Sequence, residues 1–447
     1  MLARELRRSP SRCPCPPCTS GRGPRALGAR TISTAGSRGA HSSVDRSGLR
    51  RASRSVDLSF TAAEEDFRGE LRAWLREHVP RSEAAAASLE EDVRRLRDWQ
   101  RALHAGGWVG IHWPRAYGGR GASAVEHYIL QEELAAARAP EIINRIGVNL
   151  VGPTLIAHGT EEQKRRFLPP ILPADELWCQ LFSEPGAGSD LTALRTRAEP
   201  ASGGWLVSGQ KVWTSYAQFA RWGILLARTD PAAPGAKGLG FFVCDMQAPG
   251  VSVRPLRQMT GSEEFNEVFL DAVFVPRVQL VGAENEGWAI ASTTLAHERG
   301  TSPRQLVIHR MLLDELLRLA RDGVDGAASR AADPVIRQRL AQHFIEVEIT
   351  RLNNWRTLSR LARCEPLGPE SSVVKLFWSE MSQRMHDTLM ELLGPRGLCW
   401  QPGAHAVGGG RLARSYLYYR AATLFAGTSE IQRNILAERV LGLPRAR

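Results

Sequence analysis

The segment with the clearest chemical potential is rich in glycine and small polar residues. It reads Leu181-Phe182-Ser183-Glu184-Pro185-Gly186-Ala187-Gly188-Ser189-Asp190. Glycine and serine let backbone N–H groups and hydroxyls come close to a bulky polar ligand such as a pyrophosphate. An ordinary Gly/Pro loop has the same composition, so the residues alone leave both interpretations open.

A second candidate is a carboxylate that continues an apolar helical stripe. Trp288, Ala291, Ser292 and Leu295 recur at helical spacing, and Glu298 lies one turn further on. A carboxylate in a dry pocket has a raised pKa and is a stronger base. A structural ion pair or a solvated side chain explains the same spacing.

Metal and nicotinamide sites are not predicted. His297 is not followed by a second histidine four residues later, so the zinc-binding pattern HExxH is absent. The run 235–240 does not match GxGxxG and is expected to be a loop between strands. Three cysteines lie in CPCPPC near the N-terminus and four are widely spaced, so neither a zinc site nor a disulfide framework is expected.

The net charge of +11 comes almost entirely from the first 56 residues. They hold twelve Arg, no Lys and two acidic residues, and the remainder is nearly neutral. The body of the chain therefore offers no basic surface for a nucleic acid. No apolar run reaches the ~20 residues that a membrane span needs.

Residues 1–56 are an Arg/Ser-rich leader that we expect to be disordered. Their composition fits a mitochondrial transit peptide, which would direct the chain to the mitochondrial matrix. It also fits an upstream extension from a start codon placed too early. The chain has 54 Arg and 4 Lys, a bias of GC-rich bacterial genomes, so we favour the extension and a bacterial cytoplasm.

The hydrophobic period divides the rest of the chain into three regions. Residues 57–178 are predominantly helical and begin at the capping-box pattern Thr61-Ala62-Ala63-Glu64. Short β-type runs punctuated by Gly, Pro and Asp fill residues 179–284 and predict a small sheet or barrel. The helical period returns over residues 285–447. The expected fold class is therefore α+β, mainly α.

Individual elements follow from the same patterns. The expected strands are 205–207, 211–214, 223–227, 240–244 and 268–270. The expected C-terminal helices are 288–317, 335–363, 372–393 and 428–441.

The Gly-rich segment resembles the signature of the acyl-CoA dehydrogenase family, close to TEPxAGSD. Residues 209–215, 265–276 and 425–432 resemble three further family segments in the family's order. Together they cover about residues 57–447. The resemblance implies an N-terminal helical domain, a central β-barrel-like domain and a C-terminal four-helix bundle, assembled as dimers or tetramers.

The resemblance also implies an FAD cofactor. Phe182 and Ser183 would lie along the flavin ring, mainly through backbone and hydroxyl. Trp213 would flank the isoalloxazine, and Ser215 would bond near N5. Without the family match, Trp213 is as readily interpreted as an aromatic residue of the β core.

Three other residues complete the implied cofactor site. Ser189 would approach the pyrophosphate or the CoA end of the substrate. Thr428 and Glu430 would contact FAD at a helix N-terminus, where free N–H groups favour anions.

The catalytic base departs from the commonest family pattern. Many members have a Glu directly before the Gly-Thr of the C-terminal signature, and this chain has Ala426 there. A minority place the Glu on the first long helix of the C-terminal domain, where this chain has Glu298. The resemblance therefore implies that Glu298 is the base, with Arg299 facing the CoA chain or orienting the site. Gly300 is explained equally by room for a bulky acyl group and by a local kink.

Two further departures concern the adenine end of FAD. The stretch 318–326 lacks the Phe-Gly pair expected after an Arg, and the stretch 391–397 lacks a donor Gln. In the family these residues reach the neighbouring subunit's FAD. Their absence makes a different, paralogous chain a candidate partner.

The implied function is α,β-dehydrogenation of an acyl-CoA, with hydride transfer to flavin N5 and electron-transfer flavoprotein or a similar acceptor as partner. Branched, ring-bearing and straight acyl chains remain open, as do homo- and hetero-oligomers. One alternative is a flavin monooxygenase or nitroalkane oxidase relative. Another is a catalytically silent subunit of a hetero-oligomeric acyl-CoA dehydrogenase.

Overall fold

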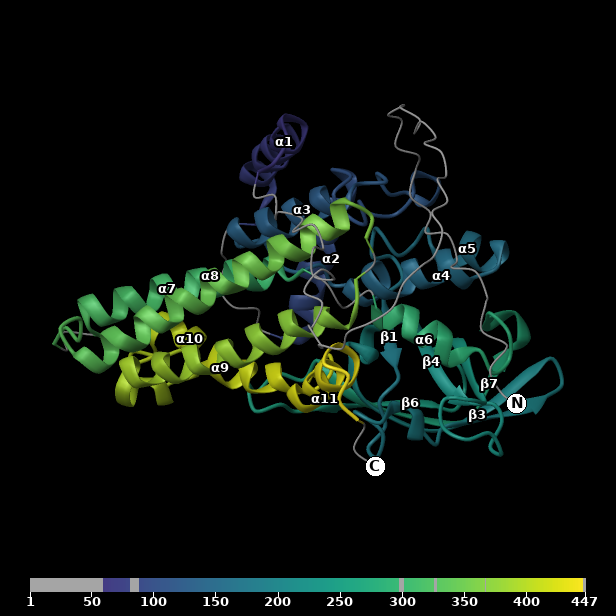
Figure 1. Cartoon of the computed structure of the whole chain (residues 1–447). Coiled ribbons are helices and arrows are strands. Elements are labelled where there is room, and N and C mark those ends of the chain that lie inside the picture. The colour runs from purple at the N-terminus through teal and green to yellow at the C-terminus, as the bar shows by residue number, and fades with distance from the viewer. Residues whose placement is uncertain (1–58, 81–87, 297–300, 325–327, 366, 445–447) are drawn as a thin grey trace, which may run out of the picture. The chain divides into compact units, whose positions relative to one another are not determined.

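The structure is a computed structural model that describes residues 59–80, 88–296, 301–324, 328–365 and 367–444 (Figure 1). Within these ranges helices come first, then a sheet, then helices again, which confirms the predicted fold class. The leader 1–56, with its expected disorder, lies outside the described residues.

The first helices begin where the sequence places their caps. The Thr61 hydroxyl accepts from Glu64 N, and the Glu64 carboxylate accepts from Thr61 N, so the predicted capping box is confirmed. Ser123 with Glu126, and Thr160 with Gln163, repeat the arrangement. The helices of this region are α1 (Ala62–His78), α2 (Leu89–Ala105), α3 (Ala124–Ala136), α4 (Gly152–His158) and α5 (Glu161–Phe167).

The strands that follow form one sheet in the order β6-β7-β3-β2-β4-β5-β8, and β1 pairs in parallel with β4. The strands are β1 (Trp178–Leu181), β2 (Arg197–Ala201), β3 (Gly204–Ser215), β4 (Trp222–Arg228), β5 (Leu239–Asp245), β6 (Val251–Leu256), β7 (Phe265–Pro276) and β8 (Leu280–Val281). One buried cluster joins side chains from strands that are distant in this order, such as Trp205 of β3 and Phe242 of β5. The sheet therefore curves around a core of its own, as the barrel-like prediction requires.

The expected strands were found, but their limits differ. The predicted runs 205–207 and 211–214 belong to one continuous strand, β3. The sequence missed β1, β2, β6 and β8, which are short or contain proline and exposed charged side chains. The run 235–240 begins in the connection between the antiparallel strands β4 and β5, as expected for a loop, but its last two residues, Leu239 and Gly240, begin β5.

The C-terminal helices pack into a bundle around buried Leu and Met side chains, including Leu316, Leu340 and Met385. Figure 1 shows α7, α8 and α9 running alongside one another, and each of these pairs is in contact. The helices are α6 (Gly287–Ala296), α7 (Pro303–Asp322), α8 (Pro334–Ala362), α9 (Ser372–Leu393), α10 (Arg411–Tyr419) and α11 (Ser429–Ile435).

The prediction of one helix over 288–317 is wrong. Thr301 and Ser302 are not helical, and α7 begins separately at Pro303. Proline disfavours the helical conformation of the preceding residue, and Ser302 has φ −125° and ψ 60°. The predicted helix 428–441 is found as α11 and a π-helical turn, Leu436–Val440, that follows it without a break. Helix α10 was not predicted.

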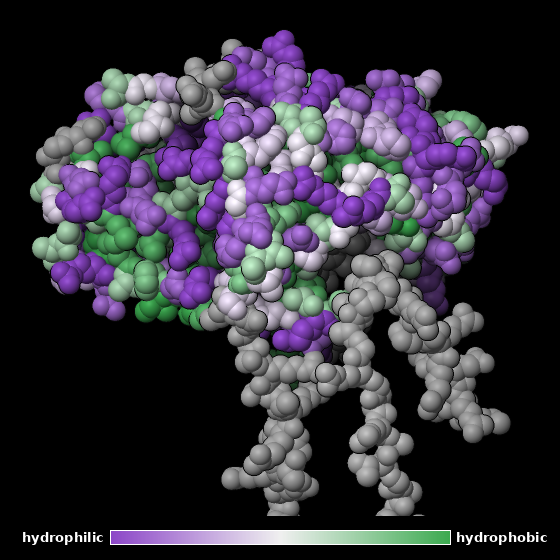
Figure 2. All heavy atoms as spheres, turned by 90° about the horizontal axis from the view of Figure 1, so that it is seen from above, coloured by the Kyte–Doolittle hydropathy of each residue, from purple (hydrophilic) through white to green (hydrophobic). Residues whose placement is uncertain are grey.

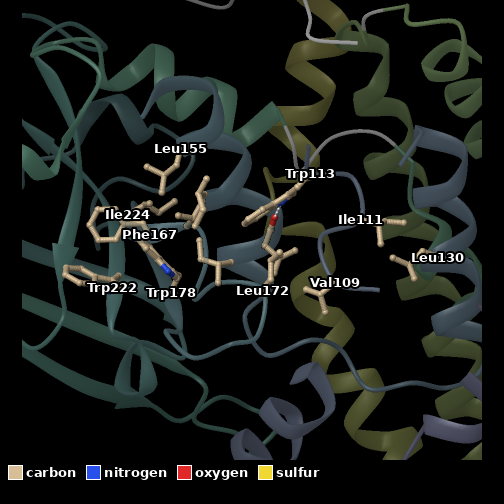
Figure 3. Packing of buried hydrophobic residues seen from close by; sticks show 14 of the residues in the cluster. Val109, Ile111, Trp113, Leu130, Leu155, Phe167, Leu172, Trp178, Trp222 and Ile224 are labelled. Atoms are coloured by element: carbon tan, nitrogen blue, oxygen red, sulfur yellow. Dashed lines mark hydrogen bonds between the residues drawn. The ribbon is translucent and has the colours of Figure 1, made fainter. Parts of the chain in front are cut away.

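Aromatic rings join the N-terminal helices to the sheet (Figure 3). Phe167 of α5 meets Trp178 and Trp222 edge to face, with ring centroids 5.6 and 5.1 Å apart. Trp113 donates its indole N–H to Val148 O at 2.9 Å, so its polar atom is satisfied inside the same core. The helical region and the sheet therefore share one hydrophobic core.

A buried amide makes the polar connection across this boundary. Asn144 is 1% exposed, and its Nδ2 donates to Ile171 O and Glu176 O, both at 3.0 Å. Its Oδ1 accepts from the backbone N–H of Trp178, the first residue of β1, at 3.0 Å. One side chain thus bonds to three main-chain groups of the segment that leads into the sheet.

The exterior is mixed, and on the face in Figure 2 hydrophilic residues predominate, with hydrophobic groups between them. Among the described residues, no helix combines the length and apolarity of a membrane span.

We expect Asn144→Ala to lower the free energy of unfolding by at least about 2 kcal/mol, because the Glu176 carbonyl and the Trp178 N–H lose the amide that bonds them, while Ile171 O keeps Gln100 and Ala174 as donors. Chemical denaturation measures this change. The partly exposed helical residue Asn353, changed to Ala, is the control and should alter stability by less than about 0.5 kcal/mol. Equal effects of the two substitutions would show that the Asn144 hydrogen bonds contribute nothing specific.

Candidate functional site

The Gly-rich segment leaves β1 and turns back on itself at once. Glu184 and Ala187 exchange two backbone hydrogen bonds, at 3.0 and 3.1 Å. A Cβ added to Gly186 or Gly188 would meet no protein atom within 4 Å. Protein packing therefore does not require glycine at these two positions, and the backbone faces open space that a ligand can approach. Ser189, on the same stretch, is exposed.

A buried ion pair fixes this loop to β3. Lys211 is fully buried, and its Nζ donates to Glu184 Oε1 at 2.9 Å, Leu226 O at 2.8 Å and Phe182 O at 3.1 Å. Glu184 is 8% exposed. Its carboxylate also accepts from the backbone N–H groups of Arg195 (2.6 Å) and Thr196 (2.9 Å). Every donor of the ammonium is used, which is the condition under which a buried pair is tolerated.

The ion pair shifts the titration of both partners. Burial lowers the pKa of Lys211 to about 8 against the opposing effect of Glu184, which leaves the amine protonated at neutral pH. Burial alone would raise the pKa of Glu184, but the Lys211 charge and the hydrogen bonds to the carboxylate hold it below its usual value. Sequence analysis did not single out this pair. The available signal was a lysine inside the β-type run Lys211-Val212-Trp213-Thr214.

A β-bulge places Trp213 on the surface beside the loop. The register of β3 against β7 shifts between Lys211 and Thr214. Val212 N donates to Ser183 O at 2.9 Å, so the bulge and the Gly-rich loop are directly joined. Trp213 has φ +59° and is 62% exposed.

This conformation is strained for a large aromatic residue, and the exposed ring buries little surface in return. The alternative that Trp213 belongs to the β core is therefore wrong. Its ring meets only the edge of Phe265, with centroids 6.1 Å apart, among the ring contacts of the described residues. A flat apolar face is left available beside the loop.

A buried asparagine, also missed by the sequence analysis, holds the strand end that carries Ser215. Asn266 is fully buried, and its Nδ2 donates to Thr214 O at 3.0 Å and Glu264 O at 3.2 Å. Tyr216 follows with φ +53°, and its N–H donates to Glu264 O at 2.7 Å. Ser215 is half-buried at the end of β3, next to the bulge.

Phe182 contributes to the site in a different way from its neighbours. Its side chain is 3% exposed and meets the edge of Phe241 at 5.8 Å, so the ring is a core residue. Its carbonyl oxygen is already used by Lys211. The structure therefore joins Ser183 to the bulge that carries Trp213, and Phe182 anchors the same loop through its ring and its carbonyl.

Thr428 and Glu430 form a separate group at the start of α11. The Thr428 hydroxyl accepts from Ile431 N at 3.2 Å and caps the helix, and Glu430 is exposed in the first turn. Ala426 and Gly427 precede them with φ +52° and +87°. No hydrogen bond in the described residues joins Thr428 or Glu430 to β3.

Glu298 and Arg299, the implied base and its neighbour, lie outside the described residues. The stripe expected to lead to them is only partly correct. Ala291 is buried, but Ser292 is exposed, and Thr294 takes the buried position instead. Thr294 Oγ1 lies 2.8 Å from Thr154 Oγ1 of α4.

The described residues contain no group of three or more His, Cys, Asp or Glu side chains arranged to hold a metal ion. The features present are an exposed aromatic face, an open Gly-rich backbone and free hydroxyls. These are suited to a large, flat, polar organic cofactor.

Family models identify the chain along most of its length. The acyl-CoA dehydrogenase N-terminal domain matches residues 61–175, the middle domain residues 179–273 and the C-terminal domain residues 285–441. The Gly-rich loop and the bulge both fall in the middle-domain match.

Curated relatives agree with this assignment. The acyl-CoA dehydrogenase IpdE1 of Mycobacterium tuberculosis is 39% identical over 388 residues, which are 85% of this chain and 98% of the relative. The acyl-CoA dehydrogenase FadE34 of the same organism is 42% identical over 375 residues, covering 83% of this chain and 49% of the longer relative.

Solved structures share the fold. The ChsE4-ChsE5 complex from Mycobacterium tuberculosis superposes with a TM-score of 0.75 at 32% identity, over 87% of this chain and all of the matched chain. The Tcur3481-Tcur3483 steroid acyl-CoA dehydrogenase gives the same TM-score, identity and coverage. The chain belongs to the acyl-CoA dehydrogenase family, a family of FAD-dependent oxidoreductases.

Proposed function

We propose that this chain introduces an α,β double bond into an acyl-CoA thioester whose acyl group carries a steroid ring system. The observation that carries the dehydrogenase part is the strained, exposed Trp213 held beside Ser183 by the buried Glu184–Lys211 pair. The steroid part is supported by the solved relative named a steroid acyl-CoA dehydrogenase, at 32% identity.

The residues of the bulge and loop suit an isoalloxazine. Trp213 would cover one edge of the ring system, and the hydroxyls of Ser183 and Ser215 would bond its polar rim. Ser189 would face the pyrophosphate or the CoA, on the stretch where Gly186 and Gly188 leave the backbone open. Thr428 and Glu430 would contribute from α11. When bound, FAD supplies the acceptor for the hydride that leaves the substrate's β-carbon.

Glu298 is the proposed base that removes the α-proton. The thioester acidifies this proton, and a carboxylate shielded from water is basic enough to take it. Ala426 cannot perform this step at the position where many family members carry their Glu. Arg299 would orient the thioester or its CoA chain, and Gly300 would leave room for a bulky acyl group.

An oligomer is the proposed assembly, with a homologous second chain as partner. The similar solved structures are named as two-chain proteins. Helix α8 exposes a row of apolar side chains, each 38–58% exposed: Phe344, Ile345, Ile349 and Leu352. The stretches 318–326 and 391–397 also lack the Phe-Gly pair and the Gln that reach the neighbouring FAD in the family. The exposed apolar row and these two departures both favour a hetero-oligomer in which each chain completes the other's cofactor site. An electron-transfer flavoprotein or a similar acceptor would remove the electrons.

The first test is an anaerobic visible titration of the purified full-length chain with octanoyl-CoA, isobutyryl-CoA and lithocholyl-CoA. The flavin absorbance should bleach most completely with lithocholyl-CoA. Bleaching by octanoyl-CoA alone would support the proposed dehydrogenase activity but contradict the proposed steroid substrate. FAD that no thioester bleaches, in the presence of a homologous partner chain as well as alone, would contradict the dehydrogenase.

We expect Glu298→Gln to retain FAD and to slow flavin bleaching at least 100-fold, because the amide cannot take the α-proton. Stopped-flow absorbance under anaerobic conditions measures the rate. Glu284→Gln, an exposed carboxylate that pairs with Arg277, is the matched control and should bleach at the wild-type rate. An unchanged rate in Glu298→Gln would remove this residue from the mechanism.

The substitution Trp213→Gly distinguishes the backbone strain at this position from the contribution of the indole ring to FAD binding. Glycine relieves the left-handed backbone and little buried surface is lost, so the flavin-free protein should gain about 1 kcal/mol of stability. The dissociation constant for FAD should rise at least tenfold. Trp213→Ala should weaken FAD binding equally without the gain, since alanine keeps the strain. Unchanged FAD affinity in both variants would show that Trp213 is not a cofactor contact.

A further inference from the structure

A cavity of about 530 Å³ lies between helix α2 and the sheet. Its walls come from α2, from the chain just before β1, from the turn after β3 and from the ends of the neighbouring strands. None of the described residues assigned above to FAD or to the acyl-CoA lines it. Small-molecule sites typically occupy roughly 300–1,000 Å³, so this cavity is large enough for an organic ligand of its own.

Arg97 of α2 brings an uncompensated positive charge into the wall of this cavity. Its Nε is buried and has no hydrogen-bond partner, and no ion pair within the described part of the chain includes its guanidinium. A buried donor without an acceptor is destabilising, and a guanidinium offers its N–H groups in a planar fork. The cavity therefore contains a donor group whose acceptor is not supplied by the described residues.

The two carboxylates of the cavity wall already have partners. Asp175 Oδ1 accepts from Arg101 Nη2 at 3.2 Å. The Glu176 carboxylate accepts from both terminal nitrogens of Arg166, at 2.9 and 3.0 Å. These two arginines neutralise the acidic side chains, which leaves Arg97 without a counter-charge.

The second cation of the wall is neutralised in the same way. Arg221 pairs with Asp245, and its guanidinium lies over the Trp222 ring, 4.5 Å from the ring centroid. The charges of Asp175, Glu176 and Arg221 are thus each balanced by a neighbour. Arg97 leaves the cavity with one net positive charge, which favours an anionic ligand with a single charge.

Much of the remaining wall is apolar. Leu177 and Met246 are buried side chains, and Phe219 and Val253 are half-buried. A ligand with an apolar body would remove these surfaces from water, which favours binding. A bare inorganic anion would meet Arg97 but would leave the apolar wall in contact with water.

Gln218 connects this cavity to the strand end that carries Ser215. It lines the cavity, its Nε2 donates to Glu263 O at 2.9 Å, and its Oε1 accepts from Asn266 Nδ2. Asn266 also bonds to Thr214 O, next to Ser215. The cavity is therefore separate from the proposed cofactor contacts but shares one wall with the segment that holds them.

We propose that this cavity is a binding site for an organic monocarboxylate, whose carboxylate bonds to Arg97 and whose apolar body lies against Leu177, Met246 and Val253. A planar carboxylate matches the fork of a guanidinium and can accept two parallel hydrogen bonds. One charge on the ligand balances the one uncompensated charge of the wall. A phosphate monoester, with a charge of about −1.5 to −2, would exceed it. The site is independent of the proposed dehydrogenase chemistry.

The test is isothermal titration calorimetry of the full-length, FAD-containing protein. The probes are octanoate and 1-naphthylacetate, each compared with its neutral primary amide. At least one carboxylate should bind saturably, with a Kd at least tenfold below that of its amide, because only the carboxylate forms charge-assisted hydrogen bonds to Arg97. Failure of both carboxylates to bind at millimolar concentration, or equal Kd values for carboxylate and amide, would overturn the proposal.

Substitution of Arg97 locates the binding. Arg97→Gln should raise the Kd of the carboxylate at least tenfold, with FAD content unchanged. Arg97→Lys keeps the charge but not the fork, so its Kd should lie between those of Arg97→Gln and the wild type. Arg94→Gln is the matched control, an exposed arginine of the same helix that does not line the cavity, and should bind as the wild type does.

A carboxylate that binds Arg97→Gln as tightly as the wild type occupies some other site, such as the acyl pocket, and the proposal is then rejected. Val253→Phe decides the question if Arg97→Gln does not fold. The larger side chain fills the cavity from β6 without changing any charge, so it should also raise the Kd at least tenfold. An unchanged Kd in Val253→Phe would contradict binding in this cavity.

Discussion

The buried Glu184–Lys211 ion pair is the interaction on which the candidate site depends. It ties the loop after β1 to the middle of β3 and, through Leu226 O, to β4. A lone ammonium or carboxylate would be unstable at this depth, so neither partner can be lost alone. Because Lys211 directly precedes the bulge, the pair also sets where Val212 and Trp213 leave the strand register. The strained backbone conformation of Trp213 is therefore stabilised by interactions of its neighbours, namely the Glu184–Lys211 pair and the Val212–Ser183 hydrogen bond.

Buried polar side chains act in a similar way at three other places where a strand or helix begins or ends. Asn144 satisfies main-chain groups where β1 begins, Asn266 does so where β3 ends, and Asn354 does so where α7 begins. Each is buried and bonds to main-chain groups at the end of a strand or helix or in the segment beside it. These amides let loops and helix ends hold fixed conformations around the site while apolar packing holds the elements together.

Local signals in the sequence were sufficient for the fold class, the capping box at Thr61 and the positions of the four longest strands, β3, β4, β5 and β7. Prediction failed where local signals conflicted. The apolar period continues across Pro303, but the helix is interrupted before this proline. Strand β6 was missed because it contains a proline and polar residues. The site was predictable only through the family resemblance. Lys211, Asn266 and Asn354 were missed because their roles come from contacts between segments 27 to 52 residues apart. The exposure of Trp213 likewise depends on a register shift against β7, which one strand's sequence does not encode.

The most direct test of this account is a double-mutant cycle on the ion pair, read as the dissociation constant of FAD. Glu184→Gln and Lys211→Met alone should each weaken FAD binding at least tenfold, since each leaves a buried charge or polar group uncompensated. In the double variant the dissociation constant of FAD should rise by a smaller factor than the product of the two single-variant factors. The reason is that both buried charges are removed together, so neither is left without its partner. Additive effects, or single variants that bind FAD as the wild type does, would contradict the claim that this pair organises the cofactor loop.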